Sequence, residues 1–547
     1  MPDRYDRREF LGRAVRTTAG GLLIPSAAAA FLEACGTGGG GSSNVPSTPR
    51  KGGSLTFATE AEINSFDARQ GAWDSTGLCY ARTVFDPLFT QAADGSVQPY
   101  LAKSISHSPD YMQWTITLRS GITFHDGSPL DASVVKANLD GVAQSPLTGP
   151  ALFNLAKTTV VDAMTVMVTT KIPWVVFPIY LTGQLGHMAG LKQLADISGK
   201  ANPIGTGPFV FKEWVPGDHF TATRNPNYWR SGLPYLDSIT WKPIPDPQSR
   251  GNSLKAGNID AMHSSDTQNV ADFKDNSSYN QVNDLNSVLG EPDMDFVMLN
   301  TAVPPMNDIR VRQALAYATD QQKYINTLGN GLTKPADGPF TKGSPYYAPS
   351  GYPTSPDQAK AKQLVAAYQA EKGPITFNFG TINTAKTRQQ NEFLQALWKE
   401  VGINTNIIQV EQSPYILNAI VGNYQAYGWR QFNSPDPDGN FVWWHSSTAL
   451  PVGTQALNFA RNKDPEVDAA LITGRTNPDT TARATAYQKI AARFAADIPY
   501  IWISPAVWIV AGSQKVQNLG KGTLPDGGKA RGMASGIVSA AEIWRTS

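Results

Sequence analysis

Alternation of apolar and polar residues predicts strands along the body of the chain. Residues 52–60 begin with two glycines and then alternate, which is typical of a strand with one buried face, and residues 159–170 read as strand as well. Residues 112–130 alternate and then reach Ser-Gly and Asp-Gly pairs, which predicts a β-hairpin. Two strongly apolar segments, residues 172–181 and 500–512, contain prolines and are too short to cross a membrane, so we expect core strands there.

Helical periodicity follows capping residues at several points. After Asn307-Asp308, the residues Val311, Leu315 and Ala318 recur at i, i+4 and i+7, as on one face of a helix. Further helices are expected after Asp131 and over residues 357–370, 385–401 and 479–496.

Predicted strands at residues 374–380 and 404–410 flank the helix at 385–401, which makes a β-α-β unit. Helices, hairpins and a crossover unit in one chain indicate an α/β fold with lobes built around mixed sheets.

The first 50 residues differ from the body. Residues 17–32 form a 16-residue apolar run after several arginines, which is too short to span a membrane and favours an export signal. Arg7-Arg8 resemble a twin-arginine signal, and Ala34-Cys35-Gly36 resembles a bacterial lipobox in which Cys35 is lipidated. Glu33 stands where a lipobox usually has a small residue, so an ordinary secretory signal is the alternative.

Composition excludes several functional classes. The 547 residues carry a net charge of +1, which argues against a nucleic-acid binder. Two cysteines cannot supply a disulfide framework, and the six histidines show no metal-ligand spacing, so we expect no metal site. The sequence has no P-loop, no complete dinucleotide fingerprint and no HExxH motif, so we expect no cofactor.

One short motif raises an enzymatic alternative. Ser133 and Lys136 match the SxxK pattern of penicillin-binding enzymes, which suggests an exported serine hydrolase. The companion SDN and KTG elements do not occur in the sequence, and Ser133 lies at the start of a predicted helix. We therefore expect that the protein is not an enzyme.

Six phrases, in order, resemble one family. Together they are similar to the extracellular solute-binding proteins, family 5, of ABC importers, the peptide/nickel-binding group, over about residues 51 to 515. Most of these phrases have a structural explanation in turns and packing, so they identify the scaffold rather than the ligand. The phrases are Phe124–Gly127, Pro203–Phe209, Arg224–Trp229, Leu254–Asp260, Pro305–Leu315 and Asn458–Asp468.

The resemblance implies a clamp of the type II periplasmic-binding-protein kind, with two lobes, mixed sheets and an extra domain inserted in the first lobe. The lobes close on a ligand by a hinge motion, and the loaded monomer docks on a membrane permease that a separate ATPase drives. A lipid on Cys35 would hold the protein at the outer face of the cell membrane. The expected domains are a signal at 1–35, a tether at 36–50, lobe I at 51–95 with 200–295 and 500–547, an inserted domain at 96–199 and lobe II at 296–499.

The resemblance also points to ligand-binding positions. In peptide-binding relatives a carboxylate three residues after a Trp in the second lobe holds the peptide amino group. Here Phe432 follows Trp429 at that distance, and counting back from Asp436-Pro437-Asp438 gives Asn433. Neither is charged, and a buried ammonium without a counter-ion is costly, so Asp436 or Asp438 would have to substitute.

Other positions complete the candidate site. Glu60 follows the first strand, where relatives contact the ligand, and could meet a cationic group. Arg430 could face an anionic group, and Trp443 with Trp444 could form aromatic walls or belong to the core. We expect oligopeptides or peptide-like solutes, with an oligosaccharide, opine, aromatic acid or metal chelate as the alternative ligand.

Overall fold

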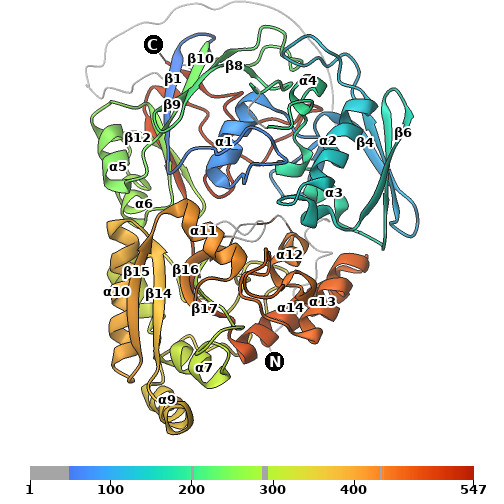
Figure 1. Cartoon of the computed structure of the whole chain (residues 1–547). Helices are drawn as coiled ribbons and strands as arrows, with labels where there is room; N and C mark the ends of the chain where they lie inside the picture. The colour runs from blue at the N-terminus through green and yellow to red at the C-terminus, as the bar shows by residue number, and fades with distance from the viewer. Residues whose placement is uncertain (1–47, 199–201, 286–292, 432–433, 435, 547) are drawn as a thin grey trace, which may run out of the picture. The chain divides into compact units, whose positions relative to one another are not determined.

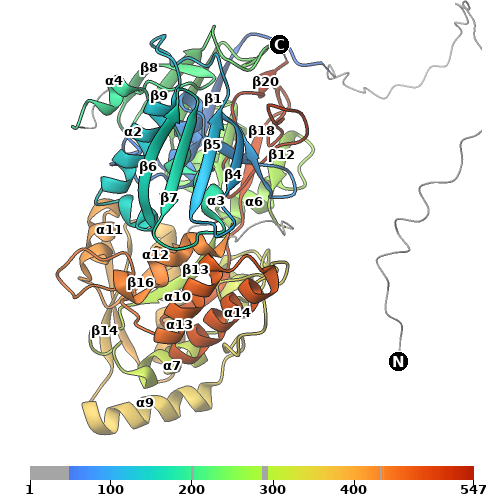
Figure 2. The ribbon, with the colours of Figure 1, turned by 90° about the vertical axis from the view of Figure 1, so that its right-hand side faces the viewer.

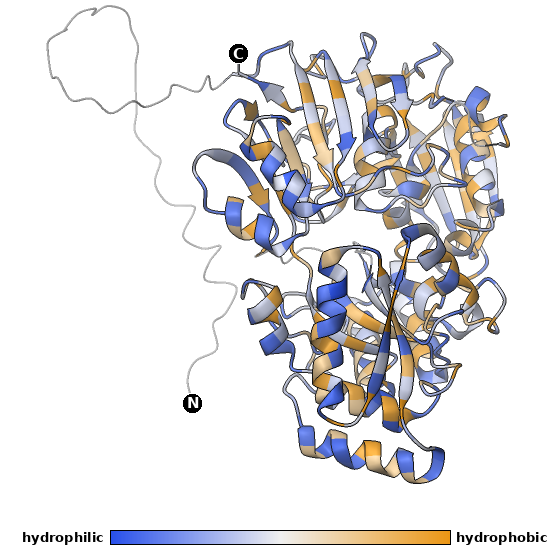
Figure 3. Cartoon of the chain, turned by 60° about the vertical axis from the view of Figure 1, so that its left-hand side comes forward, coloured by the Kyte–Doolittle hydropathy of each residue, from blue (hydrophilic) through white to orange (hydrophobic). Residues whose placement is uncertain are grey.

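Three sheets carry most of the strands (Figure 1, Figure 2). The computed structural model describes residues 48–198, 202–285, 293–431, 434 and 436–546. The predicted signal and tether, with Cys35, and the residues Phe432 and Asn433 lie outside this range. Apolar and polar residues alternate along the strands and around the helices (Figure 3), as expected for elements with one buried face.

The largest sheet has seven strands in the order β12-β18-β11-β1-β10-β9-β8. The predicted first strand is confirmed as β1, with Leu55 and Phe57 fully buried, and it runs parallel to both of its neighbours. The bounds are β1 Ser54–Thr59, β8 Phe209–Val215, β9 His219–Arg224, β10 Ser238–Pro243, β11 Ala261–Ser264, β12 Tyr279–Asn283 and β18 Ile509–Ser513.

A second sheet of four antiparallel strands lies within the predicted inserted domain. Its order is β4-β5-β7-β6, and α2, which follows Asp131 as predicted, packs on it. The bounds are β4 Ala102–His107, β5 Gln113–Leu118, β6 Leu155–Asp162, β7 Thr165–Thr170 and α2 Ala132–Gln144.

Two predictions in this region are wrong. The segment after β5 is not the second arm of a hairpin, because β5 pairs with β4 and β7. The Phe124 N–H instead donates to the Ser128 carbonyl at 2.8 Å in a local turn. Residues 172–181 form no strand and contain the short helix α3 (Phe177–Tyr180), where Pro178 sits in the first turn and has no N–H to offer a sheet.

The third sheet has the order β15-β14-β16-β13-β17. Its β14 and β15 are parallel and are joined by α10, so the predicted β-α-β unit is confirmed, as is the cap of α7 by Asp308. The bounds are β13 Met294–Leu299, β14 Thr376–Ile382, β15 Asn404–Val410, β16 Ala426–Gln431, β17 Tyr500–Pro505, α7 Ile309–Ala318, α9 Gln358–Lys372, α10 Ala385–Lys399 and α14 Thr480–Asp497.

The strand pairing disagrees with one predicted domain boundary, the one at residue 500. The strand at Tyr500–Pro505 was expected in lobe I, but β17 pairs with β13 and therefore belongs to the five-stranded sheet. The next strand, β18, joins the seven-stranded sheet, so the chain crosses between the two sheets after Pro505. The other predicted boundaries stay predictions.

The remaining elements are short, and within the described ranges no helix combines the length and the apolar composition that a membrane crossing requires. The strands are β2 Phe89–Gln91, β3 Val97–Pro99, β19 Val516–Gln517 and β20 Trp544–Arg545. The helices are α1 Ser75–Val84, α4 Leu191–Leu194, α5 Pro247–Lys255, α6 Thr267–Phe273, α8 Gln321–Leu328, α11 Gln412–Val421, α12 Phe441–Trp444 and α13 Pro465–Thr476.

Two of the family-like sequence motifs, Pro203–Phe209 and Arg224–Trp229, contribute to one buried cluster of contacts. A Cβ on Gly205 would lie 1.8 Å from the Val84 carbonyl oxygen, so only glycine fits this close approach. Nearby, the buried Asp86 carboxylate accepts from the Trp229 indole at 2.8 Å and from the Tyr228 hydroxyl at 3.2 Å. These residues therefore pack the scaffold, as their structural interpretation predicts.

Candidate functional site

Trp429 and Arg430 are neighbours on β16, and they serve two different parts of the site. Successive side chains of a strand point to opposite faces of its sheet. The register with β13 places Trp429 opposite Phe296 and Arg430 opposite Asp295. One face of β16 therefore carries an aromatic cavity. On the other face, Arg430 belongs to a group of charged and polar side chains, called here the polar cluster: Glu60, Arg250, Ser265, Asp295 and Arg430.

Glu60 anchors the polar cluster at the end of β1. Its Oε1 accepts from Arg250 Nη2 at 3.0 Å, from the Ser265 N–H at 2.6 Å and from the Ser265 hydroxyl at 3.0 Å. Burial acts to raise the pKa of Glu60, but the neighbouring cationic groups, Arg250 foremost, and the hydrogen bond from the Ser265 N–H outweigh it and lower the pKa to about 2. Glu60 is therefore ionised at neutral pH and already has a cationic partner.

Arg430 brings the five-stranded sheet into the same cluster. Its Nε donates to Asp295 Oδ1 at 2.8 Å, and its guanidinium lies 5.7 Å from the ring centre of Trp508, just before β18 of the seven-stranded sheet. Burial acts to lower the pKa of Arg430, while Asp295, Asp293 and Glu60 raise it overall. Arg430 thus keeps its positive charge where residues of the two sheets approach each other.

Asp436 is already bound by protein groups. Both of its carboxylate oxygens accept from Arg483 Nη2, at 2.6 and 2.7 Å, and Oδ2 also accepts from the Tyr346 hydroxyl at 3.1 Å. In its predicted role, a ligand amine would therefore have to compete with the buried Arg483 for the Asp436 carboxylate.

The carboxylate of Asp438 is likewise bound by protein groups, and its side chain is fully buried. Its carboxylate accepts from Arg475 Nε at 2.9 Å, from the Trp174 indole at 2.8 Å and from the Tyr180 hydroxyl at 3.0 Å. Trp174 and Tyr180 come from the chain beyond the four-stranded sheet, so Asp438 joins two parts of the fold.

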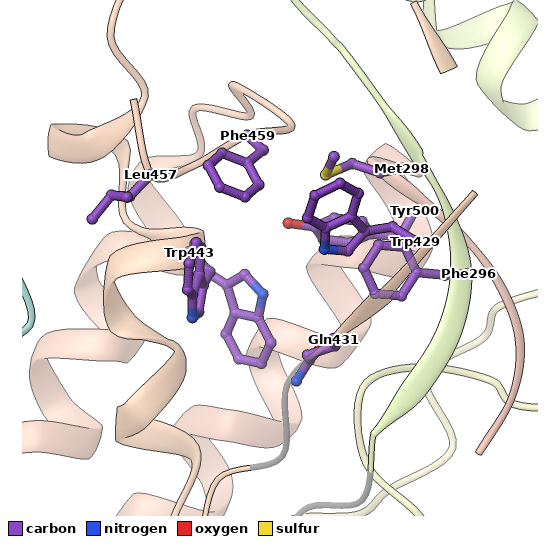
Figure 4. Close-up of a pocket in the computed structure, with 9 residues that line it drawn as sticks. Phe296, Met298, Trp429, Gln431, Trp443, Leu457, Phe459 and Tyr500 are labelled. Carbon is purple, nitrogen blue, oxygen red and sulfur yellow. The ribbon is translucent and has the colours of Figure 1, made fainter. Parts of the chain in front are cut away.

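The aromatic cavity lies on the Trp429 side of β16 (Figure 4). Phe459 contacts both the Trp429 ring, at 5.6 Å between centroids, and the Trp443 ring, at 5.1 Å. Trp444 is 3% exposed and packs on Phe494, so it belongs to the core as well as to the cavity wall. The lining residues are Phe296, Met298, Trp429, Gln431, Trp443, Trp444, Leu457, Phe459 and Tyr500, around a volume of about 30 Å³.

The SxxK residues do not form a catalytic pair. The Ser133 hydroxyl donates to Asp131, the capping residue of α2, and Lys136 pairs with Asp140 and donates to the Thr158 carbonyl at 3.0 Å. The SxxK pattern needs the lysine as the base beside the serine, and here Lys136 contacts Asp140 and Thr158 while Ser133 is held by Asp131. In the part of the chain that the structure describes, no group of three or more His, Cys, Asp or Glu residues could hold a metal ion.

Sequence reasoning missed the partners that fix the candidate residues. Arg250 and Ser265 lie about two hundred positions from Glu60. They reach it because β1 pairs in parallel with β10, which is followed by α5 and Arg250, and with β11, which ends just before Ser265. Asp295 reaches Arg430 across an antiparallel pair of strands. Alternation along 426–431 could have separated Trp429 from Arg430, had that segment been read as a strand.

Comparison with known proteins identifies a family that the chain matches and relatives of similar sequence. Residues 96–450 match the family described as "Bacterial extracellular solute-binding proteins, family 5 Middle". The glutathione-binding protein GsiB of Pectobacterium atrosepticum is 27% identical over 480 residues, which cover 84% of this chain and 89% of that protein.

Solved structures share the fold. The periplasmic binding protein DppA of Helicobacter pylori, in complex with the peptide STSA, superposes with a TM-score of 0.79 at 22% identity, covering 91% of this chain and 99% of that one. AgaA of A. tumefaciens R10, in complex with agropinic acid, gives a TM-score of 0.78 at 23% identity, with 90% and 99% covered. The predicted α/β binding-protein fold, with mixed sheets in several lobes, is thereby confirmed.

Proposed function

Because the chain belongs to the bacterial extracellular solute-binding proteins, family 5, which bind rather than transform their solutes, we propose that it captures oligopeptides or peptide-like solutes for an ABC importer. In this proposal the solute lies between the seven-stranded and five-stranded sheets. The loaded protein then delivers it to a membrane permease.

The observation that carries the proposal is the polar cluster. It brings a carboxylate from one sheet, Glu60, and a guanidinium from the other, Arg430, to one place, and each is fixed by an oppositely charged neighbour. The side chains of Glu60 and Arg430 are 23% and 35% exposed, whereas those of Asp436 and Asp438 are 7% and 0% exposed. Glu60 and Arg430 are therefore suited to the ammonium and carboxylate of a zwitterion, because they are accessible and lose little side-chain freedom on binding. Relatives support the ligand class, since GsiB is named for glutathione and DppA holds a peptide.

Selection from a peptide library tests the proposal. Residues 51–547 would be incubated with random tetrapeptides, half of them N-acetylated, and bound peptides identified by mass spectrometry. We expect enrichment of free tetrapeptides, and at least tenfold weaker retention by Glu60→Gln and by Arg430→Gln. Arg388→Gln, at an exposed pair with Glu392, is the control that should change nothing. Retention by both cluster variants at the level of the parent would contradict the proposed site.

A non-peptide solute such as an opine is the second candidate. One observation favours it: Phe432 and Asn433 are uncharged where peptide-binding relatives carry an acid, and both Asp436 and Asp438 are taken by arginines. AgaA, of the same fold, holds agropinic acid. If the library gives no enrichment while a single non-peptide compound is recovered with the protein, this candidate replaces the first.

Export and anchoring form the last part of the proposal. We place the mature protein at the outer face of the cell membrane, held by a lipid on Cys35 and the flexible stretch 36–50. Cys35→Ala should move the exported protein from the membrane fraction to the soluble fraction. Replacing Arg7-Arg8 by Lys-Lys should stop export, and normal export of that variant would refute the twin-arginine signal.

A further inference from the structure

Gln431 places an unused polar group in the aromatic cavity. The residue is 6% exposed, and its side-chain nitrogen is buried without a hydrogen-bond partner among the described residues. It lies two positions after Trp429 on β16, so both side chains project from the same face of the sheet. A buried N–H without a partner is unfavourable, because it has lost its hydrogen bonds to water and gained none in the protein.

The rest of the lining is almost entirely carbon. Phe296, Met298, Leu457 and Phe459 offer no donor. The other polar groups of the lining are the Tyr500 hydroxyl and the indole N–H groups of Trp429, Trp443 and Trp444 (Figure 4). Burial raises the pKa of Tyr500, so the hydroxyl stays protonated at neutral pH. The cavity therefore presents hydrogen-bond donors in a largely apolar frame, which suits a group with one acceptor atom and little other polarity.

The size of the cavity limits what can enter. Its volume of about 30 Å³ leaves room for a few atoms only. Trp429 and Trp443 are half-buried, so this part of the cavity wall reaches the surface. A small terminal group fits, while the rest of the molecule stays outside.

We propose that the aromatic cavity is a subsite for a small apolar group bearing a hydrogen-bond acceptor, such as an acetyl or alanyl carbonyl, with the Gln431 amide N–H as donor. This rests on the proposed function, because the subsite holds one end of the captured solute. The methyl group packs on the Trp429, Trp443 and Phe459 rings, and the carbonyl oxygen accepts from Gln431.

The first test follows the Gln431 amide directly. Protein labelled with ¹⁵N-glutamine is titrated with N-methylacetamide, and the side-chain NH₂ signal of Gln431 is assigned from its loss in Gln431→Leu. We expect this signal to move and to saturate with millimolar probe. No movement would overturn the proposal, because the cavity would then be a solvent pocket of the lobe.

Variants give a second readout through the quenching of tryptophan fluorescence by the same probe. Gln431→Leu should weaken N-methylacetamide binding by about tenfold or more, since the carbonyl enters without its donor. Gln409→Leu, on the edge strand β15, is the matched control and should bind as the parent does. Equal affinity of Gln431→Leu and the parent would overturn the proposal.

Failure of the subsite and failure of the proposed function give different results. If the parent and Gln431→Leu retain the same library peptides equally well, the subsite is wrong and the importer function stands. If neither retains any solute while N-methylacetamide still moves the Gln431 signal, the cavity binds as proposed and the peptide function is wrong.

Discussion

At the scale of single residues, Glu60 keeps its charge because Arg250, with a side chain 1% exposed, lies beside it. Removing that carboxylate leaves a buried guanidinium without its counter-ion, which is far more costly than breaking an exposed pair. The hydrogen bonds from Ser265 hold the carboxylate in one orientation. Glu60 therefore contributes to stability as well as to the proposed binding.

We predict that Glu60→Gln lowers the free energy of unfolding by about 3 kcal/mol at pH 7, measured by urea denaturation. The pKa of Glu60 is about 2 in the folded protein and 4.5 in the unfolded reference, so its contribution is complete above pH 4.5. As the pH falls from about 4.5 towards 2, the difference between parent and variant should shrink. Glu371→Gln, with an exposed carboxylate, should change stability little, and a loss as large as that of Glu60→Gln would contradict the account.

At the scale of elements, caps and strand alternation decide where functional side chains point. Asp131 begins α2 by accepting from the Ser133 and Val134 N–H groups at 2.9 and 3.0 Å. Ser133 of the SxxK motif therefore belongs to the first turn of a capped helix, which accounts for its position. On β16, successive side chains point to opposite faces of the sheet, so Trp429 lines the aromatic cavity and Arg430 belongs to the polar cluster.

We predict that Asp131→Ala costs about 1 kcal/mol of stability, because two N–H groups at the start of α2 lose their acceptor. Thermal unfolding of parent and variant measures the effect. Glu411→Ala is the control, since Glu411 precedes α11 without making a side-chain cap bond. A cost below about 0.3 kcal/mol for Asp131→Ala would show that the cap contributes little.

Local patterns predicted most elements of the fold, and long-range pairing accounts for what they missed. The capped helices after Asp131 and Asp308 and the β-α-β unit follow from residues close in sequence. The false hairpin arose because the turn signals after β5 were correct while its partners are β4, which directly precedes it, and β7, which comes after α2. For the same reason, sequence could propose Glu60 but not the arginine that fixes its charge.

At the scale of the whole molecule, Asp438 connects the part of the chain that carries the four-stranded sheet to the part that carries the five-stranded sheet. Trp174 and Tyr180 donate to Asp438, and the Val175 N–H donates to the Arg475 carbonyl at 3.0 Å. The Arg475 guanidinium lies 3.9 Å from the Phe441 ring centre and 4.8 Å from that of Trp174. The buried, hydrogen-bonded pair of Asp438 and Arg475 therefore joins these two parts of the fold.

We predict that Asp438→Asn lowers the free energy of unfolding by about 3–5 kcal/mol, because Arg475 stays fully buried without its counter-ion. Urea denaturation measures the loss. The control Glu392→Gln removes one partner of an exposed pair and should change stability by less than about 1 kcal/mol. Equal effects of the two variants would show that the Asp438 network does not join these two parts of the fold.

The most direct measurement of the central claim is the identity of the solute that the protein carries. Residues 51–547 would be purified under native conditions, denatured, and the released compounds identified by mass spectrometry. The account predicts a mixture of short peptides or a peptide-like compound, released unchanged and absent from the Glu60→Gln preparation. A protein that carries no solute and retains no library peptide would contradict it.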